Sequence, residues 1–439
     1  MEILSPGKKI KILRKKLGLR QDQLTDERIT RSLISMIENG KRRLNRKTAT
    51  IIAIKLNGFY KNLGQEITPE YLLESEEQQA SNIVDENMDS LKPILKNKKE
   101  ADQQHVFESF ERMIELANQW ELQEKEAEIF IIRGKYYFDK GEYNLTLADY
   151  FNSLEYYIAA RKVEYIAILY IRISKCYIKM SLFEQAAFYG DKAYLLADST
   201  KLPNSNEIKA KSLFNKIVCY GKTAKFDLTL QEIEKFKNLK YANDSLHDEV
   251  TLIEAETFFY LKNYEKAKKI YERLLHRESK IDIDTLIRIF ENASMLYNKI
   301  GEPSNARGAL KKAVSYKEQI EEQRVGIFLL NIAHSYYKIN DFDGAIHLLD
   351  EIMLISKEKN LSEILLTDAY ILSSEIYKAR QSFLQAEEYL LKSEYYLEKN
   401  NCRSKLNVVY SLLGELYCDM GNINASKVYF QKIRNNQRA

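Results

Sequence analysis

Residues 331–345 read NIAHSYYKINDFDGA, and this stretch holds the pattern that decides the fold. One aromatic residue, Tyr336, stands six residues before a second, Phe342, and Ala345 follows three residues after that. The spacing predicts two helices joined by a short turn, because the ring of the first helix can pack where the second helix carries only a methyl group. We therefore expect a pair of closely packed helices here.

The same pattern recurs along most of the chain. The residue equivalent to Phe342, which we call the marker of its unit, returns at intervals of 38 to 43 residues over eight units. A period this steady predicts a repeat array in which each unit is one helix pair. A helix around residues 105–120 is expected to belong to an earlier pair that caps the array. The markers are Tyr143, Phe183, Phe226, Tyr264, Pro303, Phe342, Phe383 and Ile423.

Two further features accompany the markers. A tyrosine or phenylalanine stands six residues before each marker, and a small residue stands three residues after most of them. Glycines also fall where the turns are expected, at Gly141, Gly301 and Gly421. The aromatic residues are Tyr137, Tyr177, Tyr220, Phe258, Tyr297, Tyr336, Tyr377 and Tyr417, and the clearest small residues are Ala186, Ala267, Ala306, Ala345 and Ala386.

The composition favours helices throughout. The 439 residues include only 5 Pro and 15 Gly but 30 Tyr and 18 Phe, so helix breakers are few and large rings are many. Apolar runs such as residues 129–132 are far shorter than the roughly 20 residues that a membrane helix needs. The N-terminus lacks the apolar run of a secretion signal. These observations predict an all-α protein of the cytoplasm with no membrane partner.

Residues that could carry catalysis or hold a metal are scattered. Cys176, Cys219, Cys402 and Cys418 form no closely spaced pair, and the five histidines are dispersed. The head also lacks a glycine-rich loop that could cradle phosphates. We expect no disulfide, no metal site, no cofactor and no enzymatic activity.

Positive charge is concentrated at the N-terminal end. Residues 1–64, which we call the head, hold sixteen basic and five acidic residues, a net charge of +11, whereas the rest of the chain carries −7. A basic head on a mildly acidic body suggests that the head meets a polyanion. Apolar spacing predicts helices in the head at residues 6–17, 20–28, 31–38 and 47–56 and from residue 69 onward, with Thr30 as the N-cap of the third and Gly40 at its end.

Two short strings in the head resemble a known family. The strings QDQL, residues 21–24, and SMIENG, residues 35–40, resemble the signature of Cro/repressor-type (XRE) helix-turn-helix domains. The segment Thr25–Thr30 departs from the usual pattern, because it lacks glycine, begins with Thr instead of Ala, and is one residue shorter. This shorter turn is similar to that of the RRNPP group of Gram-positive peptide-sensing regulators, such as NprR, PlcR and Rgg.

The resemblance implies a DNA-reading role for the helix at residues 31–38, which would enter the major groove. Arg31 and Ser32 would contact bases, Gln21 would touch the DNA backbone, and Lys41, Arg42 and Arg43 would bind phosphates. For each cation the alternative is a solvated surface charge, and for Ser35 and Glu38 it is a role in holding the domain together. The candidate DNA-binding residues are Gln21, Thr30, Arg31, Ser32, Ser35, Lys41, Arg42 and Arg43.

The repeats resemble tetratricopeptide repeats with a longer period, and Gly134 and Gly414 match the small position of that family. This implies a right-handed α-solenoid of about eight to nine helix pairs, whose groove is lined by the first helix of each pair and holds an extended peptide. Asparagine suits such a groove because its amide can pair with both peptide N–H and C=O groups. The alternative is an empty, hydrated groove. The candidate peptide-binding residues are Arg172, Lys175, Lys179, Lys211, Asn215, Lys222, Arg288, Asn292, Asn298, Lys299, Asn331, His334 and Lys338.

We interpret the chain as three parts: a helix-turn-helix domain at residues 1–66, a linker helix region at residues 67–100, and a repeat domain at residues 101–439 for peptide binding and dimerisation. The resemblance implies a homodimeric transcription regulator that binds a double-stranded DNA operator and responds to a short linear signalling peptide, as in quorum sensing. The alternative is a scaffold, similar to Rap-type relatives, that sequesters a partner protein such as a response regulator.

Overall fold

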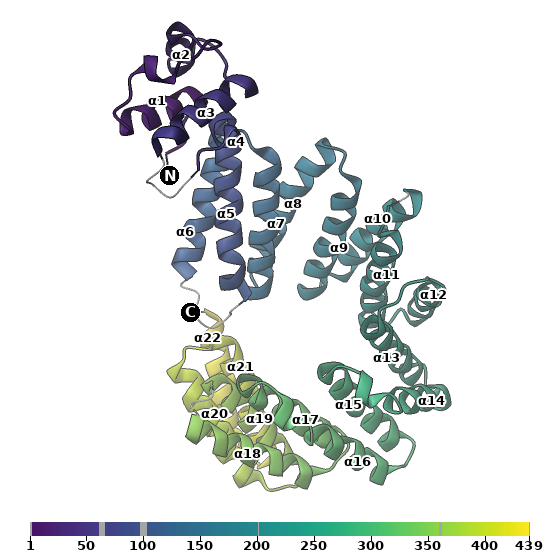
Figure 1. Ribbon diagram of the computed structural model, residues 1–439. Coiled ribbons are helices and arrows are strands. Elements are labelled where there is room, and N and C mark those ends of the chain that lie inside the picture. The colour runs from purple at the N-terminus through teal and green to yellow at the C-terminus, as the bar shows by residue number, and fades with distance from the viewer. Residues whose placement is uncertain (1, 61–65, 97–102, 201, 360–361, 439) are drawn as a thin grey trace. The chain divides into compact units, whose positions relative to one another are not determined.

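The computed structural model describes residues 2–60, 66–96, 103–200, 202–359 and 362–438. These residues form 22 α-helices and three short 3-10 helices, with an isolated bridge between Asp26 and Ile29 in place of any β-strand (Figure 1). The all-α prediction is therefore confirmed. The chain divides into two compact units, residues 1–215 and 216–439, and each is described here by itself.

In the structure the head extends to Leu73 and is a small bundle with its own core. Its elements are α1 (Pro6–Lys16), η1 (Gln21–Leu24), α2 (Arg31–Glu38), α3 (Arg46–Tyr60) and α4 (Pro69–Leu73). Gly7 lets α1 approach the end of α2, because an added Cβ would lie 2.0 Å from the Ile37 carbonyl oxygen. The core consists of Ile10, Leu19, Leu24, Ile29, Ile34, Ile37, Ala49, Ile52, Ala53, Leu56, Ile67 and Leu72.

The helix predicted at residues 20–28 is shorter than expected. Only η1 forms, because Asp26 competes for the backbone: its carboxylate accepts hydrogen bonds from the N–H groups of Arg28 and Ile29, both at 2.8 Å. Short polar side chains often end a helix in this way. The result is a tight turn between η1 and α2, whereas α2 itself begins and ends at the residues that the sequence predicted.

Two helices precede the repeats. The stretch after the head, expected as a linker helix region, forms α5 (Glu76–Lys96), which continues through Pro93. Next comes α6 (Gln103–Gln119), the helix expected around residues 105–120, and it packs against α5 through Val106, Phe110 and Met113. These two helices form the first pair of the stack.

Eight helix pairs follow, and in each pair the marker is the first residue of the second helix. The predicted phase of the repeat is thus confirmed. The first helices are α7 (Gln123–Lys140), α9 (Val163–Lys179), α11 (Ser205–Lys222), α13 (Asp244–Tyr260), α15 (Ile283–Lys299), α17 (Glu322–Lys338), α19 (Glu363–Ala379) and α21 (Arg403–Asp419). The second helices are α8 (Tyr143–Ala159), α10 (Phe183–Ser199), α12 (Phe226–Lys237), α14 (Tyr264–Leu275), α16 (Pro303–Val314), α18 (Phe342–Lys359), α20 (Phe383–Lys399) and α22 (Ile423–Arg438).

Small residues let the paired helices approach each other. All five alanines predicted at this contact are at most 1 % exposed. At the predicted small position, a Cβ on Gly134 would lie 2.7 Å from the ring of Tyr150, and one on Gly414 would lie 2.8 Å from the ring of Phe430. Close packing of this kind makes even one added methyl costly.

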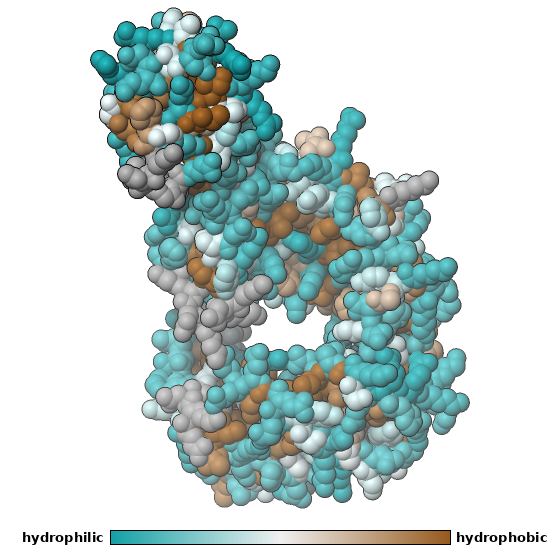
Figure 2. All heavy atoms as spheres, in the orientation of Figure 1, coloured by the Kyte–Doolittle hydropathy of each residue, from teal (hydrophilic) through white to brown (hydrophobic). Residues whose placement is uncertain are grey.

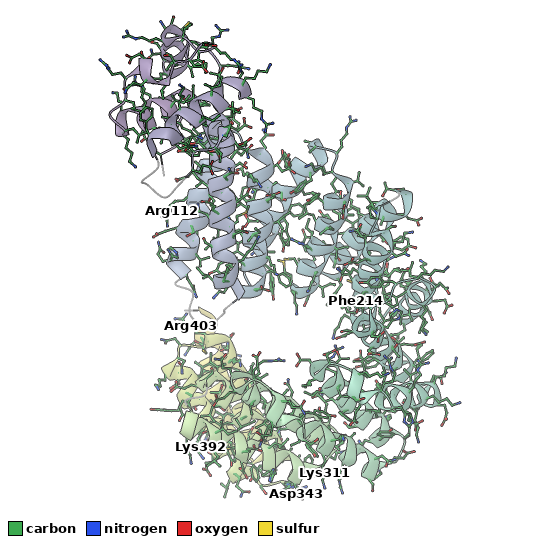
Figure 3. The ribbon with its side chains drawn as sticks, in the orientation of Figure 1. Arg112, Phe214, Lys311, Asp343, Lys392 and Arg403 are labelled. Carbon is green, nitrogen blue, oxygen red and sulfur yellow. The ribbon has the colours of Figure 1, made fainter. Side chains whose placement is uncertain are left out.

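Three units share a cluster of three tyrosines and one lysine. In each, two rings of the first helix meet one ring of the second, and the lysine three residues later lies over at least one of these rings. Lys392, labelled in Figure 3, lies 5.0 Å from the centre of the Tyr389 ring. Cation–π contacts add to the packing of the pair. The clusters are Tyr170–Tyr177–Tyr189–Lys192, Tyr370–Tyr377–Tyr389–Lys392 and Tyr410–Tyr417–Tyr429–Lys432.

Every turn within a pair uses one residue in the left-handed backbone region, two residues before the marker. Glycine holds this position in three units, as predicted, and residues with a side chain hold it in five. Such residues pay a steric penalty that glycine avoids. The residues are Gly141, Ser181, Ala224, Lys262, Gly301, Asn340, Gln381 and Gly421, with φ between 54° and 83°.

Two glycines of one unit allow the cost of a left-handed backbone to be measured without a side-chain clash. Gly301 lies in the turn at φ +80° and Gly308 lies within α16, and a Cβ at either would have no neighbour within 4 Å. We expect Gly301→Ala to lower the free energy of unfolding by about 1 kcal/mol, and Gly308→Ala to raise it by about 0.5–1 kcal/mol. Urea unfolding of both variants tests this, and equal shifts of the same sign would contradict the assignment.

Candidate nucleic-acid interface and candidate peptide groove

Helix α2 presents its first turn to solvent. The Thr30 hydroxyl oxygen caps the helix by accepting a hydrogen bond from the Leu33 N–H at 3.2 Å. Ile34 and Ile37 turn the opposite face into the core, so Arg31 and Ser32 are exposed. With no acidic residue in this turn, the positive end of the helix dipole remains available to an anion.

A buried carboxylate fixes α2 against the rest of the head. Glu38 accepts hydrogen bonds from Arg14 at 2.6 and 2.9 Å and from Gln21 at 2.8 Å. Burial would raise the pKa of Glu38, but these hydrogen bonds and the Arg14 charge outweigh it and hold the pKa below its ordinary value. Arg14 also donates to the Leu19 carbonyl oxygen at 2.7 Å. The network joins α1, η1 and α2.

Removing Arg14 should loosen the head. In Arg14→Met, the Glu38 carboxylate loses its cationic partner in a site where its side chain is 1 % exposed, so we expect a loss of about 3 kcal/mol from the stability of α2. Because the pKa of Glu38 is lowered on folding, its contribution is present near neutral pH and is lost as pH falls through the folded value. Hydrogen exchange of α2 amides should therefore differ between wild type and variant at pH 7 and converge in acid. A difference that persists in acid would contradict this role for the ion pair.

The other predicted DNA-binding residues fall into two sets. Lys41, Arg42 and Arg43 are exposed directly after α2 and have no ion-pair partner among the described residues. The Gln21 amide is held by Glu38, and Ser35 contacts Asn39, so both also have structural roles. In the view of Figure 2 the end of the head that carries α2 is mostly hydrophilic.

Sequence analysis missed two exposed cations of the head. Arg28 lies in the turn just before α2, and Lys47 lies in the first turn of α3. Arg28 was assigned to a helix that does not form there, so its position beside α2 could not be seen in the pattern. Arg28 adds positive charge directly before the first turn of α2.

The predicted peptide-binding residues are divided between the two units. In the first unit, Arg172, Lys175 and Lys179 lie on α9, and Lys211 and Asn215 lie on α11. In the second unit, Lys222 lies at the end of α11, and the remaining residues lie on α15 and α17, namely Arg288, Asn292, Asn298, Lys299, Asn331, His334 and Lys338.

In the first unit most of these groups have protein partners. Asn215 is 5 % exposed, and its amide donates to the Ile171 carbonyl oxygen at 3.2 Å. Lys211 pairs with Glu207 on its own helix, and Lys175 lies 5.4 Å from the centre of the Phe138 ring. Arg172 interacts with the phenol of Tyr150, whose pKa burial raises to about 12. Lys179 is exposed.

In the second unit the predicted basic surface is partly neutralised by carboxylates that sequence analysis missed. Arg288 pairs with Glu249 at 2.7 Å and approaches Glu256 at 4.0 Å. The Asn292 amide donates to Glu256 at 2.6 Å. Burial raises the pKa of Glu256, although the Arg288 charge opposes this shift. These contacts join α13 to α15, so Arg288 and Asn292 already serve a structural purpose.

Helix α17 is different, because a stripe of mostly polar side chains along one of its faces is accessible to solvent. Ile327, Asn331, His334 and Lys338 follow one another along one face of the helix, and Ile327 is 55 % exposed. Asn331 is exposed, and among the described residues its side chain has no hydrogen-bond partner. Burial and the nearby Lys338 charge lower the pKa of His334, which favours a neutral ring near pH 7. The adjacent Lys299 on α15 is also exposed without an ion pair among these residues.

Comparison with protein families matches two parts of the chain. Residues 10–58 match the helix-turn-helix family, and residues 251–280 match the tetratricopeptide repeat family. The head is a helix-turn-helix domain, and the array is built of tetratricopeptide-type repeats. This confirms the domain types that the sequence motifs indicated. Comparison with curated proteins gives no match.

Several solved structures are similar at low sequence identity. The apo quorum sensor NprR from B. thuringiensis is 16 % identical, with 82 % of this chain and 99 % of that chain covered and a TM-score of 0.48. Aspartyl phosphate phosphatase F from Bacillus subtilis is 14 % identical, with 100 % and 96 % covered and a TM-score of 0.39. A signal transduction ATPase with a tetratricopeptide repeat sensor from Pyrococcus horikoshii is 12 % identical, with 99 % and 66 % covered and a TM-score of 0.49.

The described residues hold no candidate for a membrane-spanning helix or a metal site. No helix among them is long and apolar enough to cross a membrane. Within the same residues, no group of three or more His, Cys, Asp or Glu side chains is placed to hold a metal ion.

Proposed function

We propose that this protein is a cytoplasmic, non-enzymatic transcription regulator whose helix-turn-helix head binds double-stranded DNA under the control of a short peptide held by the repeats. One observation carries the proposal. The first turn of α2 is exposed and free of acidic residues, the exposed cations Lys41, Arg42 and Arg43 follow the helix without ion pairs among the described residues, and the repeats present an open polar stripe on α17. A head built to bind an anion and repeats open to a ligand together suit a regulator.

The head supports DNA binding through geometry as well as charge. An exposed α2 can enter the major groove, where Arg31 can donate two hydrogen bonds to a guanine. Lys41, Arg42 and Arg43 would contact phosphates on the adjoining backbone. One head covers one half-site, so useful affinity requires two heads, which a homodimer supplies.

Arg31→Ala should weaken binding to the specific operator by roughly 1–3 kcal/mol while leaving binding to random DNA nearly unchanged. Arg42→Ala serves as the matched control, because loss of a phosphate contact should weaken binding to both kinds of DNA about equally. Fluorescence anisotropy at one fixed salt concentration measures all four affinities. An equal loss on both DNAs for Arg31→Ala would reassign this residue to phosphate binding.

The second unit supports peptide binding on α17. The exposed Asn331 amide can pair with both the N–H and C=O groups of an extended strand, and Ile327 offers an apolar contact beside it. Lys338 and Lys299 would attract a carboxylate, either the peptide C-terminus or an acidic side chain. The cation of Arg288 is already paired, so it would hold the wall of the groove in place.

Asn331→Ala should reduce affinity for the signalling peptide by about 1–3 kcal/mol, because the partner groups of the peptide would lose their hydrogen bonds. The control is Asn305→Ala. Asn305 lies on α16, the second helix of its pair, and its amide donates a hydrogen bond to Glu302 at 2.8 Å. Because the groove is lined by first helices, this variant should bind the peptide normally. Isothermal titration with synthetic peptides encoded by short reading frames beside the gene measures both. Unchanged affinity in Asn331→Ala would remove α17 from the groove.

The peptide would act by shifting populations. It controls DNA binding only if it binds one placement of the two heads more tightly than another. The first experiment is a mobility shift with DNA from upstream of the gene, with and without these peptides. A shift that changes with one peptide supports the regulator, whereas a protein that binds no DNA in either state favours the protein-sequestering scaffold.

A further inference from the structure

The head does not end at α3. Ile67 and Leu72 are 6 % and 0 % exposed within the head core, so α4 belongs to the head. Only Glu74 and Ser75 separate α4 from α5. On one side of this junction lies an open cleft of about 730 Å³, lined by Arg46, Glu70, Tyr71, Leu73, Glu74, Ser75 and Gln78. Packing on that side does not fix the angle between the head and α5.

A buried lysine holds the junction itself and is connected to α5 through Glu74. Lys9 on α1 is 2 % exposed, and its ammonium donates to the Tyr71 carbonyl oxygen at 2.8 Å, the Glu74 carbonyl oxygen at 3.2 Å and the Glu74 carboxylate at 2.8 Å. It also lies 4.7 Å from the centre of the Tyr71 ring. All three ammonium protons are thus used, as a buried lysine requires. The carboxylate is held from the other side by Asn82 of α5 at 2.6 Å.

A glutamine of α5 makes a second connection to the head. The Gln79 side chain accepts a hydrogen bond from the Leu4 N–H at 3.1 Å and donates to the Leu4 carbonyl oxygen at 2.7 Å. Its amide also lies within hydrogen-bond distance of the carbonyl oxygens of Glu74 and Ser75. The main chain of Leu4, just before α1, is therefore bound by a side chain from the start of α5.

We propose that Lys9 and Gln79 lock the head to α5, so that the head and α5 move as one rigid lever and the orientation of α2 follows that of α5. Both residues are positioning residues, since neither lies at α2 or on the α17 stripe. The role of the lever in relaying a peptide signal rests on the proposed function, but its rigidity does not. A residue at the junction can then set the placement of the DNA-reading helix without touching DNA.

The lever can be tested in the full chain without DNA or peptide. Spin labels at Lys47→Cys on the head and Glu86→Cys on α5, both exposed positions, report the distance between the two parts. Cys402 and Cys418 are replaced by Ser so that only the intended sites are labelled, since Cys176 and Cys219 are buried. The test variants are Lys9→Met, which keeps the aliphatic stem, and Gln79→Ala. Gln78→Ala is the matched control, because the one hydrogen bond of its side chain among the described residues goes to Asn82 of the same helix and does not reach the head.

We expect one narrow distance distribution for the unmodified junction and for Gln78→Ala, and a broader distribution for Lys9→Met and Gln79→Ala. Hydrogen exchange at residues 2–9 should become roughly tenfold faster in both test variants, while α2 amides stay protected. A broad distribution at the unmodified junction, or a narrow one in Gln79→Ala, would overturn the proposal. If Lys9→Met unfolds the head, the α2 amides lose their protection from hydrogen exchange. In that case the result for Gln79→Ala alone tests the proposal. Failure of the regulator function leaves each of these readouts unchanged.

Discussion

The structure of the repeats depends on one contact: the close approach of the two helices of each pair, at which five of the eight second helices carry an alanine. The five alanines at this contact are fully buried or nearly so. This contact sets the distance between the paired helices and hence the phase in which the next pair can stack. A larger residue there would push apart two helices that share a core, which explains why the spacing is so regular along the chain.

Much of the fold could be predicted because this contact leaves a visible period in the sequence. Each marker begins its second helix, and α2 has the predicted bounds. The helix predicted at residues 20–28 was wrong because its end depends on a local event, the capture of backbone N–H groups by Asp26, which apolar spacing does not record.

The candidate sites were harder to predict, because a charged residue looks the same in sequence whether it is paired or free. Lys9 and Arg14 contribute to the basic head in a count of charges, yet the structure buries Lys9 and partly buries Arg14, each paired with a carboxylate. Arg288 was predicted to be an unpaired cation, but in the structure it pairs with Glu249. Glu249 lies 39 positions earlier in the chain, on the first helix of the preceding pair. Pairs of this kind follow the repeat period, so comparing equivalent positions of neighbouring units could have found them.

The left-handed turns have a consequence for how the array can change over time. Five of the eight turns within pairs carry a residue with a side chain where glycine would be less strained. Substitution by glycine at any one of these turns could therefore raise the stability of the array independently of the others. Such a reserve lets single turns gain or lose stability without altering the contacts of a groove or a head. The chain can therefore absorb harmful changes elsewhere by adjusting turns, and its surface is free to drift while the stack of helices persists.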